Sequence, residues 1–579
     1  MKFLFTRNLL HALLIASLLT QSAISQKPAP APVSTPNKGI VLTALQDELV
    51  RAQKILKTKG DPPPYLIAYQ VYETNQTAIT AQYGALQNSD NYRGRFLDVD
   101  VRVGDYQLDN THRAGGGGGN YGGGGATPIS SEDDLDSIKS SIWMVTDQKY
   151  KAAQERLIQI KADRAVKVVE EDQSADLSRE TPQVSVTATP VLNKLDKAAW
   201  EKKVKEWSGL FNKYPDILSS NASFNMDATT KYLVNSEGTS IQHGGTHARL
   251  TIYARTKAED GMELYRYETF DAFTPDKLPA DSVITAAVEK MAKDLMDLRK
   301  APVIEPFTGP AILSGRASGV FFHEIFGHRI EGHRQKEEDS GQTFTKQVNK
   351  PILPSFISVF DDPTLKQLGG IDLNGHYQFD DEGVKAQRVA VVENGILKNF
   401  LMSRAPIKNF SNSNGHGRKQ PGMRAVGRQG NLLVQAAETV SETKLRELLI
   451  EECKKQNKPF GLVFVDISGG FTTTGRSAPQ AFQVTPVMVY KVYADGRPDE
   501  LVRGVDLIGT PLTSFSKIVA ASNSTEVFNG VCGAESGWVP VSAISPSILT
   551  TQIEVQKKPK SNERLPILPP PSLEKPVSH

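Results

Sequence analysis

The feature that most constrains this chain is an apolar segment that runs directly into a cluster of histidines and glutamates. Residues 311–322 begin with AIL and end with VFF, and the next stretch, HEIFGHRIEGH at 323–333, holds three of the ten histidines in the chain. The apolar side chains indicate a helix packed into a core. Buried imidazoles and carboxylates need polar partners, so the fold has to supply those partners at this segment.

The spacing of the first two histidines departs from the familiar zinc motif. His323 and His328 are five residues apart, whereas the histidines of H-E-x-x-H are four apart and share a helix face. Five residues correspond to about 140° around an ideal helix, so the two imidazoles would splay apart. Joint metal binding therefore requires a local widening of the helix, which Gly327 permits. Glu324, next to the first histidine, is the candidate general base for a metal-activated water.

A catalytic zinc needs a third protein ligand and one open position. The candidates are Glu331, His333 and a distant cysteine. Cys532 lies in the sequence GVCGAESG, whose glycines allow the backbone to approach another element closely. Cys453 lies in a charged helical pattern, EECKK, and looks incidental. In an exported protein, the alternative is a disulfide between Cys453 and Cys532.

Composition excludes several other classes of protein. Two cysteines among 579 residues exclude a disulfide scaffold and a four-cysteine zinc site. The 67 Lys and Arg residues nearly balance the 65 Asp and Glu residues, which gives a net charge of +2. A dedicated nucleic-acid binder needs a concentrated positive field, so no nucleic-acid partner is expected.

The N-terminus has the pattern of a secretory signal peptide. A basic start precedes an apolar stretch at 9–19, and small residues precede a cleavage site before Gln26. The apolar stretch is shorter than the roughly 20 residues needed to cross a bilayer, and no later run reaches that length. We therefore expect residues 1–25 to be removed, and the mature protein to be periplasmic or extracellular without a membrane span.

The mature chain divides near Pro302 and Pro306 into two domains. Residues 39–300 predict an α+β domain, because strands and helices come in blocks rather than as alternating β-α-β units. Amphipathic or polar helical patterns cover 41–58, 131–172, 200–211 and 280–299, and strand patterns cover 65–73, 77–86, 95–103 and three or four stretches within 229–273.

Residues 301–556 predict a mostly-β domain that carries the helix with the histidine cluster. Strand patterns cover 388–402, 461–468, 481–493 and 548–556, and one more helix is expected at 441–455. Low-complexity segments join or flank the domains: a Pro-rich linker at 26–38, a Gly-rich loop at 114–127 and a disordered Pro-rich tail at 557–579.

Six short segments, in order, resemble the TldD/PmbA family of zinc metallopeptidases. His323–His328 is similar to the family's H-E-x-x-x-H signature. The segments that follow it in family order are Asp380-Asp381-Glu382-Gly383, Gly415-His416-Gly417-Arg418, Gly469-Gly470, Leu507-Ile508-Gly509 and Cys532-Gly533. The resemblance covers 301–556 closely and 39–300 loosely. The chain departs from the family pattern at His333 and in the residues after Cys532.

The resemblance implies a fold and a site. It implies an α+β protein with an N-terminal mixed α/β domain and a C-terminal mostly-β catalytic domain that carries the metal-site helix. In TldD-type members the two motif histidines and the C-terminal cysteine bind zinc. Carried over, His323, His328 and Cys532 hold one Zn²⁺ per chain and Glu324 is the catalytic carboxylate. Because TldE-type subunits lack the motif, this chain resembles the active type.

The resemblance also implies partners. Family members cleave short or unfolded peptides and form dimers, so we expect a peptide substrate and a homodimer or a heterodimer with a TldE/PmbA-like paralogue. The peptide is expected to add to a sheet edge, with the strands at 388–402 and 481–493 as candidates.

Two other functions compete with the peptidase. Ser514 and Lys517 fit the S-x-x-K pattern of some serine hydrolases, but no accompanying motif is present. The second alternative is an exported, catalytically inactive peptide-binding or partner subunit of a TldD/PmbA-like complex. The intact histidine and glutamate set and the retained Cys532 count against it.

Overall fold

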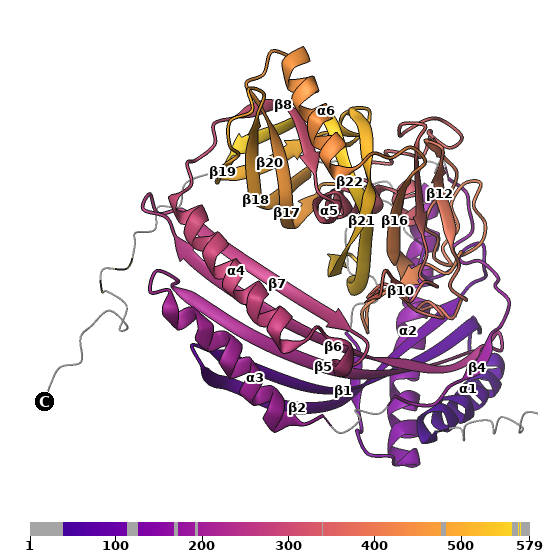
Figure 1. The fold of residues 1–579 in the computed structure, drawn as a ribbon. Coiled ribbons are helices and arrows are strands. Elements are labelled where there is room, and N and C mark those ends of the chain that lie inside the picture. The colour runs from indigo at the N-terminus through magenta and orange to yellow at the C-terminus, as the bar shows by residue number, and fades with distance from the viewer. Residues whose placement is uncertain are drawn as a thin grey trace, which may run out of the picture. The chain divides into compact units, whose positions relative to one another are not determined.

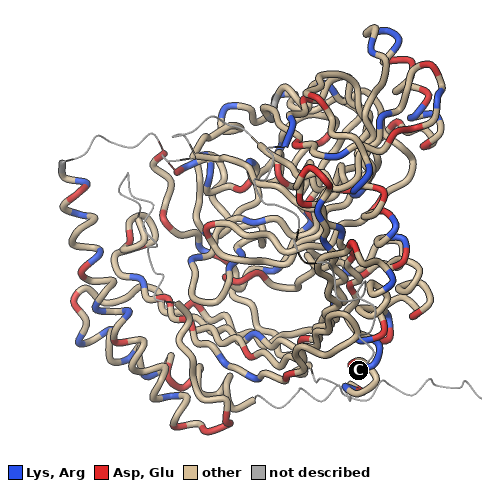
Figure 2. Tube along the Cα trace, turned by 90° about the vertical axis from the view of Figure 1, so that its left-hand side faces the viewer, with Lys and Arg blue, Asp and Glu red and all other residues tan. Residues whose placement is uncertain are grey.

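The computed structural model describes residues 39–112, 125–166, 172–190, 195–337, 340–475 and 482–558, together with 566 and 568. The predicted signal peptide 1–25, the linker 26–38, most of the Gly-rich loop 114–127 and nearly all of the tail 557–579 lie outside the described residues. Within the described part of the chain, no helix is long and apolar enough to cross a membrane. Basic and acidic residues are interspersed along the trace (Figure 2), in keeping with the net charge of +2.

A seven-stranded sheet occupies the N-terminal part of the chain (Figure 1). Its strands are β1 (Pro64–Gln82), β2 (Ala85–Val103), β3 (Thr127–Ile129), β4 (Val184–Val186), β5 (Ser219–Asn235), β6 (Ser240–Lys257) and β7 (Glu263–Ala272). They pair in the order β3-β2-β1-β5-β6-β4, and β7 also pairs with β6. All of these pairs are antiparallel except β4 with β6.

Four helices pack on one face of this sheet: α1 (Ile40–Lys59), α2 (Leu135–Val166), α3 (Lys197–Gly209) and α4 (Asp281–Lys300). Burial along β5 alternates with period two, so that Phe224 and Met226 pack in the helix-covered core while Asn225 and Asp227 lie on the opposite, polar face. The four predicted helices are confirmed. The polar face of the sheet matters below because its β6 and β7 residues reach the candidate site.

The prediction of separate strands at 65–73 and 77–86 is wrong. β1 runs unbroken to Gln82 and turns into β2 through Tyr83 and Gly84, whose φ values are 50° and 85°. The polar stretch at 73–76, which the sequence suggests as a break, pairs with β2 on one side and β5 on the other. Pairing on both sides keeps the backbone extended despite the polar side chains.

An eleven-stranded sheet occupies the C-terminal part of the chain. Its strands are β8 (Phe307–Leu313), β9 (Ile357–Asp361), β12 (Val389–Glu393), β13 (Ile396–Leu397), β16 (Asn431–Ala436), β17 (Phe460–Thr472), β18 (Phe482–Tyr493), β19 (Glu500–Val502), β20 (Val505–Gly509), β21 (Ile518–Ala534) and β22 (Gly537–Lys557). The long strand β22 pairs with β16, β20, β21 and β8 and so joins the parts of this sheet.

Short elements complete this part of the chain. They are the helices α5 (Gly315–Ile325), α6 (Glu442–Lys455) and α7 (Pro511–Phe515), the two-stranded pairs β10 (Gln367–Leu368) with β11 (Ile371–Asp372) and β14 (Gly417–Arg418) with β15 (Val426–Gly427), and the 3₁₀ turns η3 (Gly327–Arg329) and η4 (Gly332–Gln335). The 3₁₀ turns η1 (Leu210–Lys213) and η2 (Pro275–Lys277) belong to the N-terminal part. The α+β class and the mostly-β character of the C-terminal part are confirmed.

Buried polar contacts join the two sheets. Arg266 of β7 places Nη1 2.8 Å from Oδ2 of Asp466 on β17, and both side chains are buried. Nearby, the hydroxyls of Tyr265 and Ser468 are 2.7 Å apart. These contacts hold the edge of the first sheet beside the strand that borders the candidate site.

Candidate metal centre

Helix α5 carries the first histidine into the core of the second sheet. Ser314 caps the helix, because its hydroxyl accepts a hydrogen bond from the backbone N–H of Ala317 at 3.3 Å. A Cβ at Gly319 would lie 3.1 Å from the carbonyl oxygen of Ala543, so the helix lies tightly against β22. His323 lies in the last turn of α5 and is 7% exposed.

The second histidine does not lie on this helix. The chain leaves α5 after Ile325 and tightens into the 3₁₀ turn η3, which carries His328. The prediction of a widened helix is therefore wrong: the helix ends, and the change of direction brings the two imidazoles together. Their ring centroids are 5.2 Å apart with the planes at 76°. Gly327 is needed for space, since its Cβ would lie 2.0 Å from Oε1 of Gln429.

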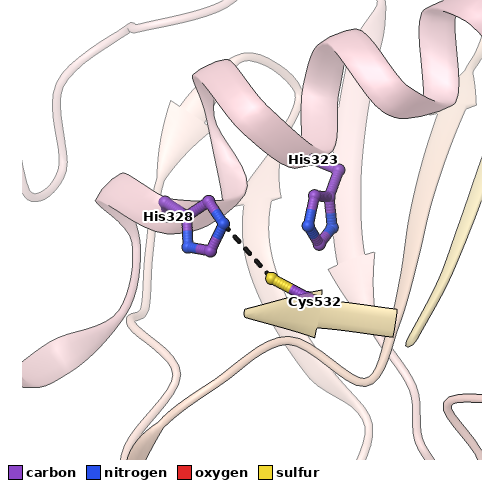
Figure 3. A group of neighbouring side chains, drawn as sticks. All are labelled: His323, His328 and Cys532. Carbon is purple, nitrogen blue, oxygen red and sulfur yellow. Dashed lines mark hydrogen bonds between the residues drawn. The ribbon is translucent and has the colours of Figure 1, made fainter. Parts of the chain in front are cut away.

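Cys532 joins the two histidines from β21, more than 200 residues along the chain. Its Sγ lies 3.3 Å from Nε2 of His328, and one ligand atom from each of the three residues lies within 4.8 Å of the others (Figure 3). All three side chains are buried. Of the three candidates for the third metal ligand, only Cys532 places a ligand atom close to those of both His323 and His328.

This donor set fits a zinc ion. Zn–N distances of about 2.0 Å and Zn–S distances of about 2.3 Å in a tetrahedral site place nitrogen and sulfur ligands about 3.6 Å apart, close to the 3.3 Å between His328 and Cys532. Nδ1 of His323 is buried and has no hydrogen-bond partner among the described residues. Two imidazoles and a thiolate are ligands that zinc accepts readily.

Glu331 orients His328 through the ring nitrogen that faces away from Cys532. Oε1 of Glu331 lies 3.1 Å from Nδ1 of His328, so the imidazole turns its Nε2 toward Cys532. Metal-ligating histidines commonly make this kind of contact through their second nitrogen. Arg334 holds the carboxylate with a 2.8 Å hydrogen bond from Nε. Burial would raise the pKa of Glu331, but His328 and Arg334 outweigh burial and lower it to about 2.

His333 lies in a neighbouring network and does not join the His323 group. Its Nε2 contacts Oε1 of Glu535. Arg334 donates from Nη2 to Glu535 at 2.8 Å and from Nη1 to the hydroxyl of Thr474 at 2.7 Å. Glu331, His333 and Glu535 also lie close enough to share an ion. Arg334, however, already neutralises both carboxylates, which argues against a second cation there.

Electrostatics favour an ionised sulfur and a carboxylate that exchanges protons. Burial opposes ionisation of Cys532, but His328 and His323 outweigh it and hold the pKa of the thiol well below its usual value. Burial raises the pKa of Glu324 above the usual range, and the same two histidines oppose this rise. Oε2 of Glu324 is 4.0 Å from Nε2 of His328.

The three candidate ligands and Glu324 open onto a cavity of about 640 Å³. One wall is formed by Gly469–Thr472 of β17 and another by Phe528–Ala534 of β21. Arg249, Tyr267 and Thr269, from the polar face of the first sheet, also line it. These three residues carry no signal in the sequence, because only the tertiary contact between the sheets brings them to the site.

Two predictions about sheet edges need correction. β18 (Phe482–Tyr493), which falls in the predicted stretch 481–493, is paired by β17 on one side and by β19 and β20 on the other, so it offers no free edge. The stretch 388–402 holds β12, which lies between β9 and β13, and β13 has only two residues. Neither strand lines the cavity. The cavity is instead bordered by β21, which among the described strands pairs only with β22.

The structure also contradicts the disulfide alternative. Cys453 and Cys532 are both free, and Cys453 is buried against Leu445 and Leu449 of its own helix. The S-x-x-K alternative gains no support, because the hydroxyl of Ser514 donates to the carbonyl of Thr510 at 3.0 Å and is not among the cavity-lining groups.

Comparison with known proteins identifies the C-terminal part of the chain. Residues 307–557 match the family model described as the PmbA/TldA metallopeptidase C-terminal domain. This part of the chain is therefore similar to the C-terminal domain of PmbA/TldD-family proteins. A metalloprotease of Archaeoglobus fulgidus is 30% identical over 239 residues, which cover 41% of this chain and 51% of that protein. One of Methanocaldococcus jannaschii is 27% identical over 327 residues, 56% of this chain and 67% of that protein.

The matched stretch thus spans between half and two thirds of the length of these relatives. Solved structures extend the likeness of fold to most of the described chain. TldE of Thermococcus kodakarensis is 12% identical with a TM-score of 0.58, and covers 89% of this chain and 100% of its own. A Thermotoga maritima protein described as a modulator of DNA gyrase is 17% identical, also with a TM-score of 0.58, over 88% and 99%. At these identities the likeness concerns the fold alone.

Proposed function

We propose that this protein is an exported zinc metallopeptidase that hydrolyses peptide bonds in short or unfolded peptides. His323, His328 and Cys532 hold one zinc ion per chain, and Glu324 is the general base. The observation that carries the proposal is the convergence of these three ligand atoms, from a helix, a 3₁₀ turn and a distant strand, beside the largely buried carboxylate of Glu324 on a cavity wall. The metalloprotease relatives support the same reaction class.

When bound there, zinc would polarise a peptide carbonyl and make a water molecule more acidic. The residues of the chain do the remaining work. Glu324 accepts the proton of the attacking water and then delivers it to the leaving amine. Its raised pKa suits both steps, since a carboxyl group that titrates closer to neutrality exchanges protons with water and amine more evenly than an ordinary carboxylate does. Glu331 keeps His328 turned toward the site.

The substrate is held as an extended strand against β21. That strand pairs only with β22 among the described strands, and its Phe528–Ala534 stretch lines the cavity. Strand addition uses backbone hydrogen bonds and so accepts many sequences, provided that the substrate is unfolded. Phe471, Val531 and Trp538 line the cavity and remain 60%, 48% and 64% exposed, so they offer apolar contacts to substrate side chains.

Export and assembly complete the proposal. The N-terminal pattern of residues 1–25 supports secretion to the periplasm or the medium. The similarity of fold to TldE supports a dimer, formed with a second copy or with a TldE/PmbA-like paralogue.

The first test is the metal content of the purified protein from residue 26 onward, beside Cys532→Ser. We expect about one zinc per chain in the parent protein and a sharp loss in the variant. Cys453→Ser is the matched control, because that thiol is buried in a different core and its loss leaves the zinc content unchanged. Absence of metal from the parent protein, even after zinc is supplied, would refute the metallopeptidase.

The second test is peptide cleavage by Glu324→Gln. We expect this variant to bind zinc and to lose cleavage, while Glu305→Gln, an exposed carboxylate paired with Lys557, retains both. Full activity of Glu324→Gln would rule out the assigned base. Peptide binding without cleavage in the zinc-loaded parent protein would instead indicate an inactive partner subunit.

A further inference from the structure

A buried arginine that the family motifs do not include reaches the sulfur of the metal site. Arg428 lies between β15 and β16 and is fully buried. Its Nη2 donates to Sγ of Cys532 at 3.2 Å and to the carbonyl oxygen of the same residue at 2.9 Å. Its Nη1 donates to the hydroxyl of Ser536 at 2.8 Å and to the carbonyl oxygen of Gly537 at 3.1 Å. One guanidinium therefore spans the turn between β21 and β22.

The same side chain reaches a second ligand through a carboxylate. Nε of Arg428 lies 3.4 Å from Oε1 of Glu331, and that oxygen is the one that contacts Nδ1 of His328. Arg428 is therefore in contact with one candidate ligand directly and with another through one intermediate. This double contact ties the sulfur and the imidazole to a single cationic group.

A role limited to the hairpin does not account for this arrangement. Neutral groups satisfy the carbonyls of Cys532 and Gly537 equally well, whereas a buried guanidinium is costly unless anionic partners surround it. Its anionic partners here are the thiolate of Cys532 and the carboxylate of Glu331. The planar fork of an arginine suits this geometry, because its two Nη groups reach the two sides of the hairpin between β21 and β22 while its Nε faces Glu331.

We propose that Arg428 is a positioning residue of the metal site, which orients the Cys532 thiolate and withdraws electron density from it through the N–H···S hydrogen bond. This inference rests on the proposed metal site. A thiolate donates more charge to zinc than a third imidazole does, and so weakens its Lewis acidity. A hydrogen bond from a cation to the sulfur reduces that donation, and the contact with Glu331 fixes the angle of His328 at the same time.

The test uses the cobalt(II)-loaded full mature chain, because a thiolate bound to cobalt gives a charge-transfer absorption whose energy reports the electron density on sulfur. Arg428→Lys keeps the positive charge but removes the fork. We expect its charge-transfer band to move to lower energy and its affinity for cobalt and zinc to fall by about 10- to 100-fold, the usual range when a residue behind a metal ligand is lost.

Arg404→Lys is the matched control. Arg404 is also a buried guanidinium that binds a carboxylate, Glu237, and a backbone carbonyl, that of Ser178, but it touches none of the candidate ligands. We expect this variant to lose stability while keeping the parent band and affinity. A band at the parent position in Arg428→Lys, with metal affinity within about twofold of the parent, would overturn the inference.

Two further outcomes are separable. If the parent protein loaded with cobalt shows no thiolate charge-transfer band, the proposed ligand set itself fails. If Arg428→Lys does not fold, the parent protein loaded with ¹¹³Cd and labelled with ¹⁵N-arginine decides the question. A scalar coupling between the cadmium and a guanidinium proton of Arg428 supports the N–H···S hydrogen bond, and a bound, sharp cadmium signal without that coupling contradicts it.

Discussion

Gly327 offers the sharpest test of how this chain brings two histidines together. It stands where α5 gives way to η3, between the two candidate ligands. A Cβ added there would lie 2.0 Å from Oε1 and 2.2 Å from Cδ of Gln429. Favourable contacts between heavy atoms lie near 3.5–4.0 Å, so Gln429 would have to move by more than about 1 Å. Only 1% of its surface is exposed, and its Nε2 donates to the carbonyl of His323 at 3.3 Å.

The cost of Gly327→Ala follows from these contacts. Overpacking a buried site costs about 1–3 kcal/mol. Displacing Gln429 also breaks its hydrogen bond to the carbonyl of His323, which is worth about 1 kcal/mol. The free energy of unfolding should therefore fall by about 2–4 kcal/mol. Because the carbonyl that loses its donor belongs to His323, a candidate ligand, zinc affinity should fall as well.

A double-mutant cycle distinguishes this steric account from a backbone effect. Gln429→Ala removes the clashing amide, so Gly327→Ala should cost at least about 1 kcal/mol less in that background than in the parent chain. The measurement is urea unfolding of the metal-free protein, so that zinc binding does not contribute to stability. Strictly additive losses would refute the reasoning, since they would place the need for glycine in the backbone rather than in the space beside Gln429.

Three further predictions test other parts of the structure. In Glu331→Gln, the loss of stability of the metal-free protein between pH 7 and pH 3, measured by urea unfolding, should shrink by about 2 kcal/mol. The pKa of Glu331 is about 2 in the folded protein, below the ordinary value of 4.5, so this carboxylate adds stability that is complete above about pH 4.5 and is lost as the pH falls toward 2. An equal loss of stability in acid for the variant and the parent protein would contradict that shift. Arg266→Gln should cost about 1–3 kcal/mol in urea unfolding, because it removes the 2.8 Å partner of Asp466 at the contact between the sheets and leaves that buried carboxylate with only one guanidinium, Nε of Arg316 at 3.2 Å; a loss below about 0.5 kcal/mol would mean that Arg316 alone compensates the charge. Trp538→Ala should raise KM several-fold for peptides with large apolar residues near the cleaved bond and leave kcat nearly unchanged, whereas an equal change for polar peptides would show that the exposed indole makes no substrate contact.

Local patterns predict most of the elements of this fold. Helical spacing locates α1, α3, α4 and α6 to within a few residues, since each presents one apolar stripe to a sheet. Strand pairing is less predictable. β1 continues through the polar residues 73–76 because two neighbours pair with it, and β18 is interior because β20 returns from further along the chain. Such long-range pairings leave little trace in the local sequence.

In the candidate site, too, the residues that are close in sequence are predictable and the long-range contacts are not. His323, Glu324 and His328 are close in sequence, and their spacing alone indicates metal chemistry. The sequence does not reveal how they converge. Five-residue spacing is compatible both with the widened helix that we expected and with the helix end and 3₁₀ turn that the structure has. Arg428 carries no sequence signal, since its meaning comes only from the sulfur and the carboxylate that surround it.

The distribution of the site over the chain has a consequence for its stability. His323 and His328 come from the end of α5 and the turn after it, Cys532 from β21, and Arg428 from the approach to β16, and β22 pairs with both β21 and β16. The ligand set therefore depends on the pairing of β22 with these strands, because no local segment brings sulfur and imidazole together. A ligand that binds the folded state alone stabilises it by mass action. Zinc should accordingly stabilise the assembled sheet as a whole, and its removal should weaken strands that carry no ligand, β16 among them, as much as α5.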